Sequence, residues 1–129
     1  MNQTSIAAGI SVLSSVLLAA ACADVVSPDL LIEPIQIESV EVSVLESFPP
    51  RAVAHVKGVL GDGCAELHSV QQERTGSTVT LTILRERPRD AVCTMIAKLD
   101  DQNIPLTGDY PPGSYLLLVN GFEKRFVTQ

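Results

Sequence analysis

The feature that most constrains the fold is a hydrophobic pattern with a period of two residues. From Thr78 to Ile83, threonines alternate with Val, Leu and Ile, and a similar alternation runs through residues 35–44 and 52–60. Successive side chains of a β-strand point to opposite faces, so this pattern places apolar residues on one face and polar residues on the other. A slip in the alternation between Ile37 and Val40 predicts a bulge or a change of face. The chain is therefore expected to be all-β.

Turn-forming residues separate the strands. The breaks are Pro49-Pro50, Gly61-Asp62-Gly63, Thr75-Gly76-Ser77 and Asn120-Gly121. Asn120-Gly121 between two apolar runs favours a type I′ hairpin, because both turn positions need positive φ. Residues 64–74 predict a less regular strand, residues 85–90 a loop, and residues 91–99 either a strand or a short helix. This spacing is typical of about seven short strands in an antiparallel β-sandwich.

The N-terminal segment carries a different signal. The first 23 residues contain no charged side chain, and Val12 to Leu18 has the length of a signal-peptide core. The small residues before Cys22 resemble the lipobox of bacterial lipoproteins, with Ala19 where a leucine is usual. The resemblance implies that Cys22 becomes the lipidated first residue of the mature protein. Cleavage after Ala21 or Ala23 without lipid, an uncleaved anchor and a different start site remain open.

The predicted organisation has three parts. Residues 1–21 form a lipoprotein-type signal peptide, residues 22–34 a tether, and residues 35–129 a single β-sandwich domain. Prolines at positions 28 and 34 favour an extended tether, since proline cannot donate a ladder hydrogen bond. The alternative is that Leu30-Leu31-Ile32 forms a short first edge strand.

Charge narrows the classes of partner. The formal net charge is −6, and all charged residues follow the leader. An acidic domain without a basic stripe argues against nucleic acid as a partner, because that binding depends on neutralising phosphates. It also argues against adsorption to an anionic bilayer. Membrane contact is expected only through the lipid on Cys22.

The C-terminal residues support a resemblance at the level of the fold. Pro112-Gly113-Ser114-Tyr115 followed by Val119-Asn120-Gly121 resembles the last strands of immunoglobulin-like and fibronectin-type sandwiches. With Cys64, Cys93 and Ile104-Pro105-Leu106, this pattern is similar to small uncharacterised bacterial secreted or lipoprotein domains. The resemblance implies an immunoglobulin-like β-sandwich and a tyrosine corner at Tyr115, whose hydroxyl ties back to nearby backbone. An ordinary half-buried strand tyrosine is the alternative, and the core tryptophan of antibody domains is missing.

The remaining cysteines form an even pair. In an oxidising compartment, Cys64 and Cys93 are expected to form a disulfide that closes a loop of about 30 residues. Two buried free thiols or a redox pair are the alternatives, although no C-x-x-C motif lowers a thiol pKa here.

Candidate chemistry is sparse. His55 and His68 have neither zinc-site nor catalytic spacing, and the sequence contains no nucleophile elbow. No catalytic, metal-binding or cofactor-binding residues are therefore predicted, and the protein is not expected to be an enzyme. Arg85, Arg87 and Arg89 around Pro88 form a possible binding loop for a carboxylate or polyanion, with a solvated loop as the alternative.

These observations favour one function over two others. The leading hypothesis is an exported protein, anchored in the cell envelope by lipid at Cys22 or else freely secreted or periplasmic. It would act as a non-catalytic binding or accessory module for an envelope or extracellular protein or glycan. The alternatives are an unrecognised hydrolase and a secreted protease inhibitor of chagasin-like type. Gly61-Asp62-Gly63 and Arg87-Pro88 faintly resemble the inhibitory loops of that last family.

Overall fold

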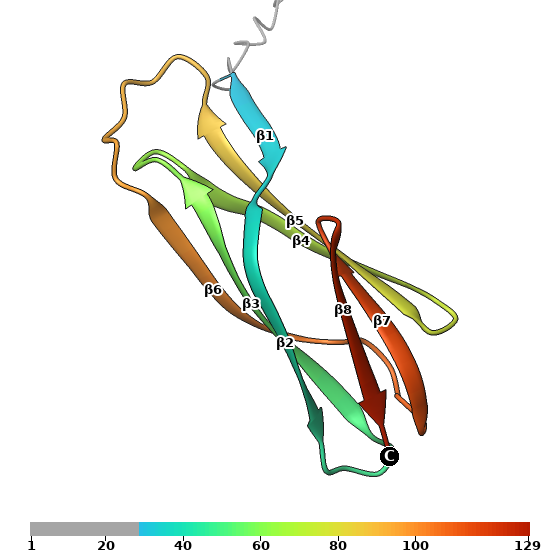
Figure 1. Cartoon of the computed structure of the whole chain (residues 1–129). Helices are drawn as coiled ribbons and strands as arrows, with labels where there is room; N and C mark the ends of the chain where they lie inside the picture. The colour runs from blue at the N-terminus through green and yellow to red at the C-terminus, as the bar shows by residue number, and fades with distance from the viewer. Residues whose placement is uncertain (1–28) are drawn as a thin grey trace, which may run out of the picture.

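The computed structural model describes residues 29–129, which form eight β-strands (Figure 1). The predicted signal peptide and Cys22 lie outside the described residues. In chain order the strands are β1 Leu30–Pro34, β2 Gln36–Leu45, β3 Arg51–Gly61, β4 Glu66–Thr75, β5 Thr78–Pro88, β6 Lys98–Pro105, β7 Gly113–Val119 and β8 Phe122–Thr128. Among the described residues, no helix is long and apolar enough to cross a membrane.

The strands form two sheets, which confirms the predicted β-sandwich. One sheet contains five strands (β1, β4, β5, β7 and β8), and the other contains β2, β3 and β6 in that order. All pairs are antiparallel except β5 with β7, which run parallel over residues 78–81 of β5. The sandwich therefore has one more strand than the spacing predicted and one parallel pairing.

Strand β5 organises the larger sheet. Along one edge it pairs with β7 at Thr78–Leu81 and with β1 at Leu84–Pro88, while β4 follows its other edge. After β1 the chain crosses to the second sheet, and the buried Ile35 donates its N–H to the carbonyl of Ile83 at 3.1 Å. Residues 30–34 are therefore part of the sandwich. The predicted tether of residues 22–34 was wrong there, because β5 offers β1 an open strand edge, which Pro34 tolerates at its end.

The core confirms the period-two pattern. Apolar residues from alternate positions of β3, β5 and β7 are fully buried between the sheets; the largest are Leu81, Ile83, Leu117, Val56, Val79 and Val119. The predicted irregularity is also present, because the pairing of β2 with β3 shifts between Ile37 and Ser39. The shift lets Val40 point inward, since one extra residue reverses which side chains face the core.

Two local predictions need correction. The expected loop at residues 85–90 is mostly strand, because β5 continues to Pro88 and pairs there with β1. Neither alternative for residues 91–99 holds throughout. Residues 91–97 have no regular secondary structure, and β6 begins at Lys98. The first error arises because the arginine-rich part of β5 lacks alternation in its own sequence and is paired by β1, whose residues lie 50 to 58 positions earlier.

Candidate functional site

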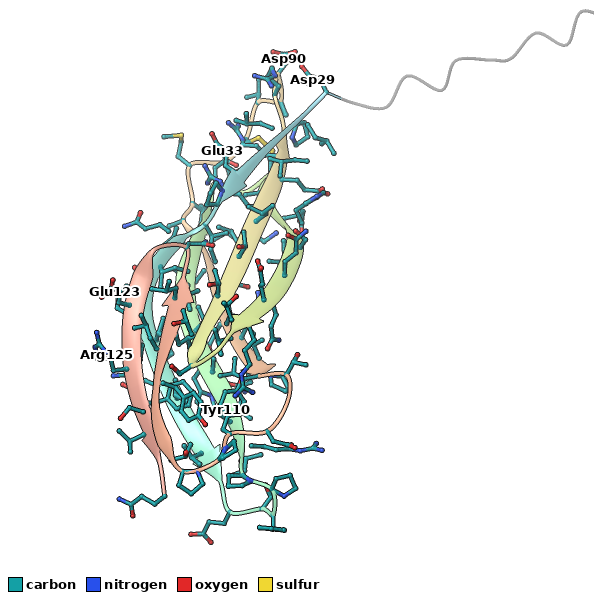
Figure 2. All side chains as sticks on the ribbon, turned by 90° about the vertical axis from the view of Figure 1, so that its right-hand side faces the viewer. Asp29, Glu33, Asp90, Tyr110, Glu123 and Arg125 are labelled. Carbon is teal, nitrogen blue, oxygen red and sulfur yellow. A yellow bond between two sulfur atoms is a disulfide. The ribbon has the colours of Figure 1, made fainter. Side chains whose placement is uncertain are left out.

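One end of the sandwich combines a disulfide, an irregular loop and the first described residue. The β3–β4 turn, the β5–β6 loop and the start of β1 meet there, at the top of Figure 1. Asp29 and Asp90 mark the same end in Figure 2. We call this region the disulfide end.

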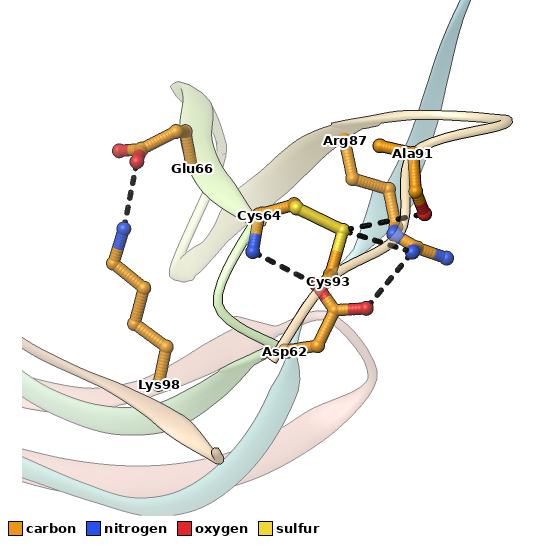
Figure 3. The surroundings of a disulfide bond; sticks show 7 residues. All are labelled: Asp62, Cys64, Glu66, Arg87, Ala91, Cys93 and Lys98. Carbon is orange, nitrogen blue, oxygen red and sulfur yellow. Dashed lines mark hydrogen bonds and ion pairs between the residues drawn. A yellow bond between two sulfur atoms is a disulfide. The ribbon is translucent and has the colours of Figure 1, made fainter. Parts of the chain in front are cut away.

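The predicted disulfide is present. Cys64 and Cys93 are bonded, with their Cα atoms 5.5 Å apart and 29 positions apart in the sequence. The bond joins the β3–β4 turn to the β5–β6 loop. Asp62 shapes the turn, because its Oδ1 accepts a hydrogen bond from the backbone N–H of Cys64 at 3.1 Å (Figure 3). The disulfide therefore ties the two loops covalently, beside a backbone hydrogen bond that also joins them.

The loop beside the disulfide presents large apolar side chains to solvent. Val92 is fully exposed, Met95 is 97% exposed and Ile96 is 70% exposed. We call these three residues the apolar tip. The backbone between Val92 and Met95 is held at two neighbouring residues. Cys93 is bonded to Cys64, and the Thr94 carbonyl accepts the Gly63 N–H at 3.0 Å. The loop is thus held in place while it exposes apolar side chains, and apolar side chains that lie together on a surface mark contact sites.

The three arginines predicted as a binding loop do not share a loop. Arg85 and Arg87 belong to β5, and only Arg89 lies beyond it. Each pairs with a carboxylate within the fold: Arg85 with Glu33 at 2.7 Å, Arg87 with Asp62 at 2.9 Å and Arg89 with Asp29 at 2.9 Å. Binding of an anion at these arginines would have to break these pairs.

The pairing of Arg87 with Asp62 bears on two further possibilities. Gly61-Asp62-Gly63 and Arg87-Pro88 are the two segments that resemble inhibitor loops, and this ion pair of 2.9 Å joins them to each other. Asp62 also lies near the sulfurs of Cys64 and Cys93, which is a spacing compatible with a metal site. Both sulfurs are consumed by the disulfide, however, which leaves a single carboxylate already paired with an arginine. The cluster is structural.

His55 lies in a row of hydrogen bonds across the smaller sheet. Its Nε2 is 2.9 Å from the Ser43 hydroxyl, and its Nδ1 is hydrogen-bonded to the Asn103 side-chain oxygen. Serine, histidine and asparagine in this order have the connectivity of a nucleophile, a base and an orienting group. Sequence analysis missed the row, because β2, β3 and β6 each contribute one member. The row lies on an exposed sheet face.

His68 is separate from this row. It lies on β4 in the other sheet, where its Nδ1 is 2.6 Å from a carboxylate oxygen of Glu86 on β5. The structure therefore does not bring the two histidines together.

The opposite end of the sandwich is held by aromatic side chains. Tyr110 is completely buried, and its ring lies 5.1 Å from that of Tyr115 and 5.8 Å from that of Phe126. The guanidinium of Arg74 covers the Tyr110 ring at 4.3 Å. Burial raises the pKa of the Tyr110 hydroxyl above 10, although Arg74 opposes the shift. We call this region the aromatic end; Tyr110 labels it in Figure 2.

The tyrosine corner implied by the resemblance is found at this end. The Tyr115 hydroxyl donates to the Pro111 carbonyl at 2.6 Å, and Thr128 donates to the same oxygen at 2.7 Å. The central position of Tyr110 gave no comparable sequence signal, because it precedes two prolines in a loop.

Asn120 forms the predicted turn and also makes hydrogen bonds to two other segments of the fold. Asn120 and Gly121 have φ values of 49° and 86° and form the expected two-residue hairpin between β7 and β8. The Asn120 amide also donates to the carbonyls of Ile35 at 3.0 Å and Ile83 at 2.9 Å, and accepts from the Ile83 N–H at 2.9 Å. The Asn120 side chain thus hydrogen-bonds to β5 at Ile83, between the part of β5 that pairs with β7 and the part that pairs with β1.

Fold and surface together define a disulfide-stapled β-sandwich domain. Comparison with known families agrees: residues 54–128 match the ORF11 beta-sandwich domain, and the chain belongs to this family.

Similar proteins come from Herpetosiphon aurantiacus. The uncharacterized 10.2 kDa protein in the HgiCIIM 5′ region is 38% identical over 84 residues, covering 65% of this chain and 89% of the relative. The uncharacterized 10.2 kDa protein in the HgiBIM 5′ region is 34% identical over 74 residues, covering 57% of this chain and 90% of the relative. No solved structure matches the chain.

Proposed function

We propose that this protein is exported, anchored in the cell envelope by lipid on Cys22, and acts as a non-catalytic binding module. The observation that carries the binding role is the apolar tip: Val92, Met95 and Ile96 project from a loop fixed by a disulfide. Exposed apolar side chains are unfavourable in water, and three large ones within residues 92–96 of one disulfide-held loop are suited to a contact surface.

The disulfide supports export. Cys64 and Cys93 pair within hydrogen-bonded loops, and disulfides persist mainly in oxidising compartments. The charge-free N-terminal segment up to Cys22 would act as the export signal that such a protein needs.

The anchor is tested by the intact mass of the protein extracted from the membrane fraction. We expect a chain that begins at Cys22 and carries a diacylglyceryl or triacyl group. The matched control, Cys22→Ala, is expected to lose this mass and to leave the membrane fraction. A wild-type product that begins at Cys22 or Asp24 without lipid would contradict the anchor.

A hydrolase is the second candidate, favoured only by the Ser43–His55–Asn103 row. Catalysis at a serine also needs donors that stabilise the oxyanion and a site that excludes water, and the row lies on an exposed face. We expect no turnover of ester or peptide substrates and no labelling by a fluorophosphonate probe. Labelling that Ser43→Ala abolishes would replace the binding module with a hydrolase.

A further inference from the structure

We propose that the apolar tip lies in the interface of the membrane that holds the protein, so that the partner of this surface is a zwitterionic lipid bilayer. This inference rests on the proposed envelope location, and it names the partner of the same surface. Three features of the disulfide end support it: the shape of the tip, the pairing of its charges and the place where the chain enters the fold.

The tip is convex. The Val92 side chain is fully exposed and that of Met95 is 97% exposed, so both stand clear of the fold. Separate projecting side chains suit insertion among lipid headgroups and upper acyl chains, where an amphipathic surface is buried to a depth of about 5–10 Å. Because the disulfide and the Gly63–Thr94 hydrogen bond already hold the backbone, little conformational freedom would be lost on insertion.

The four cations around the tip are each paired with a carboxylate, and Asp90 adds a further negative charge at the same end. Four cations lie at this end, and each has a carboxylate partner within 2.9 Å; the pairs are Arg85–Glu33, Arg87–Asp62, Arg89–Asp29 and Lys98–Glu66. The disulfide end therefore offers no basic patch for anionic lipid, in keeping with the acidic net charge of −6. Its apolar surface, and not its charge, would determine attraction to a bilayer.

The chain enters the fold beside the tip. The Asp29 carbonyl accepts the Arg89 N–H at 2.9 Å, and the Asp29 carboxylate is 2.9 Å from Arg89 Nε, next to the tip loop. Cys22 is seven residues before Asp29 (29 − 22 = 7). Seven extended residues span at most about 25 Å. Lipid on Cys22 would therefore keep the disulfide end, and not the aromatic end, at the bilayer.

This orientation can be tested with tryptophan fluorescence. It contains no tryptophan, so one introduced indole reports only its own surroundings. Met95→Trp and Ile96→Trp place the probe on the tip. Phe48→Trp is the matched control, because the Phe48 side chain is also completely exposed but belongs to the β2–β3 loop at the opposite end.

Each full-length variant is reconstituted into phosphatidylcholine vesicles, with and without bromine on the upper acyl chains, and tryptophan fluorescence is measured. We expect brominated lipid to quench the tip variants at least about twofold, with a blue-shifted emission, because an interfacial depth of about 5–10 Å brings the indole next to the bromine atoms. Emission from Phe48→Trp should be unchanged. Equal quenching at both ends, or none at either tip position, would overturn the inference. Using two tip positions guards against one substitution that disturbs the loop.

The result is separable from the test of the anchor. If Cys22 carries lipid but the tip is not quenched, the envelope location stands and this inference fails. If Cys22 carries no lipid, vesicles are added to the soluble protein. Quenching confined to the tip variants then supports the inference although the anchor is absent.

Discussion

The two ends of the sandwich are stabilised by different physical means. At the aromatic end, three buried rings pack together under Arg74, and two hydroxyls converge on the Pro111 carbonyl. At the disulfide end a covalent bond and ion pairs hold the loops. The large apolar side chains of the tip loop point outward there. An end that turns its apolar residues inward gains stability from packing, whereas an end that exposes them needs other bonds and retains a surface for contact.

The largest expected effect is at the aromatic end. Tyr110→Ala removes a fully buried ring and leaves a cavity, which should lower the free energy of unfolding by about 3–5 kcal/mol. Tyr110→Phe is the control, because it keeps the ring and removes only the hydroxyl that donates to the Thr107 carbonyl at 3.2 Å. Urea unfolding measures both. A loss from Tyr110→Ala no greater than that from Tyr110→Phe would show that ring packing does not stabilise this end.

The disulfide is expected to come next. Replacing Cys64 and Cys93 together by alanine opens a loop of 29 residues, at a cost of about 2–4 kcal/mol. The loss should be accompanied by faster proteolysis within residues 89–97, because one attachment of the tip loop is removed. Reduction of the wild type should reproduce both changes. If the loop stays as resistant as in the wild type, its hydrogen bonds alone support the tip.

A smaller effect separates two roles of Asn120, which lies between the ends. Glycine accepts a φ of 49° without strain, so Asn120→Gly would be nearly neutral if the side chain served only the turn. We expect a loss of about 1–3 kcal/mol, because Ile35 and Ile83 lose their side-chain partners. Thermal unfolding of the variant and the wild type decides between the two roles.

The smallest effect is confined to alkaline solution. The pKa of Tyr110 is raised in the folded protein by burial, so above pH 10 the unfolded chain releases this proton before the folded chain does. The folded state then binds more protons than the unfolded state, and stability falls as the pH rises. We expect unfolding curves between pH 9 and 11 to show a decline that is weaker in Tyr110→Phe. The same decline in both proteins would assign it to other groups.

Local sequence features predicted much of the fold. Alternation located the buried faces of β3 and β5, and Asn120-Gly121 located the last hairpin, because side-chain period and turn geometry depend on neighbouring residues. The disulfide was predictable from the even number of cysteines left after Cys22. The arginines were misjudged because their partners lie far away: Glu33 and Arg85 are 52 positions apart. The His55 row was missed for the same reason, since Asn103 lies 48 positions beyond it.

Local sequence patterns alone specify an acidic, all-β chain in which Cys64 and Cys93 are suited to a disulfide. Long-range contacts place β1 and β7 along the same edge of β5, put the Asn120 side chain between them and pair the arginines with carboxylates. They also place the apolar tip beside Asp29. The physical reason is that alternation and turns are encoded over a few residues, whereas these contacts depend on which distant strand edges the two sheets bring together.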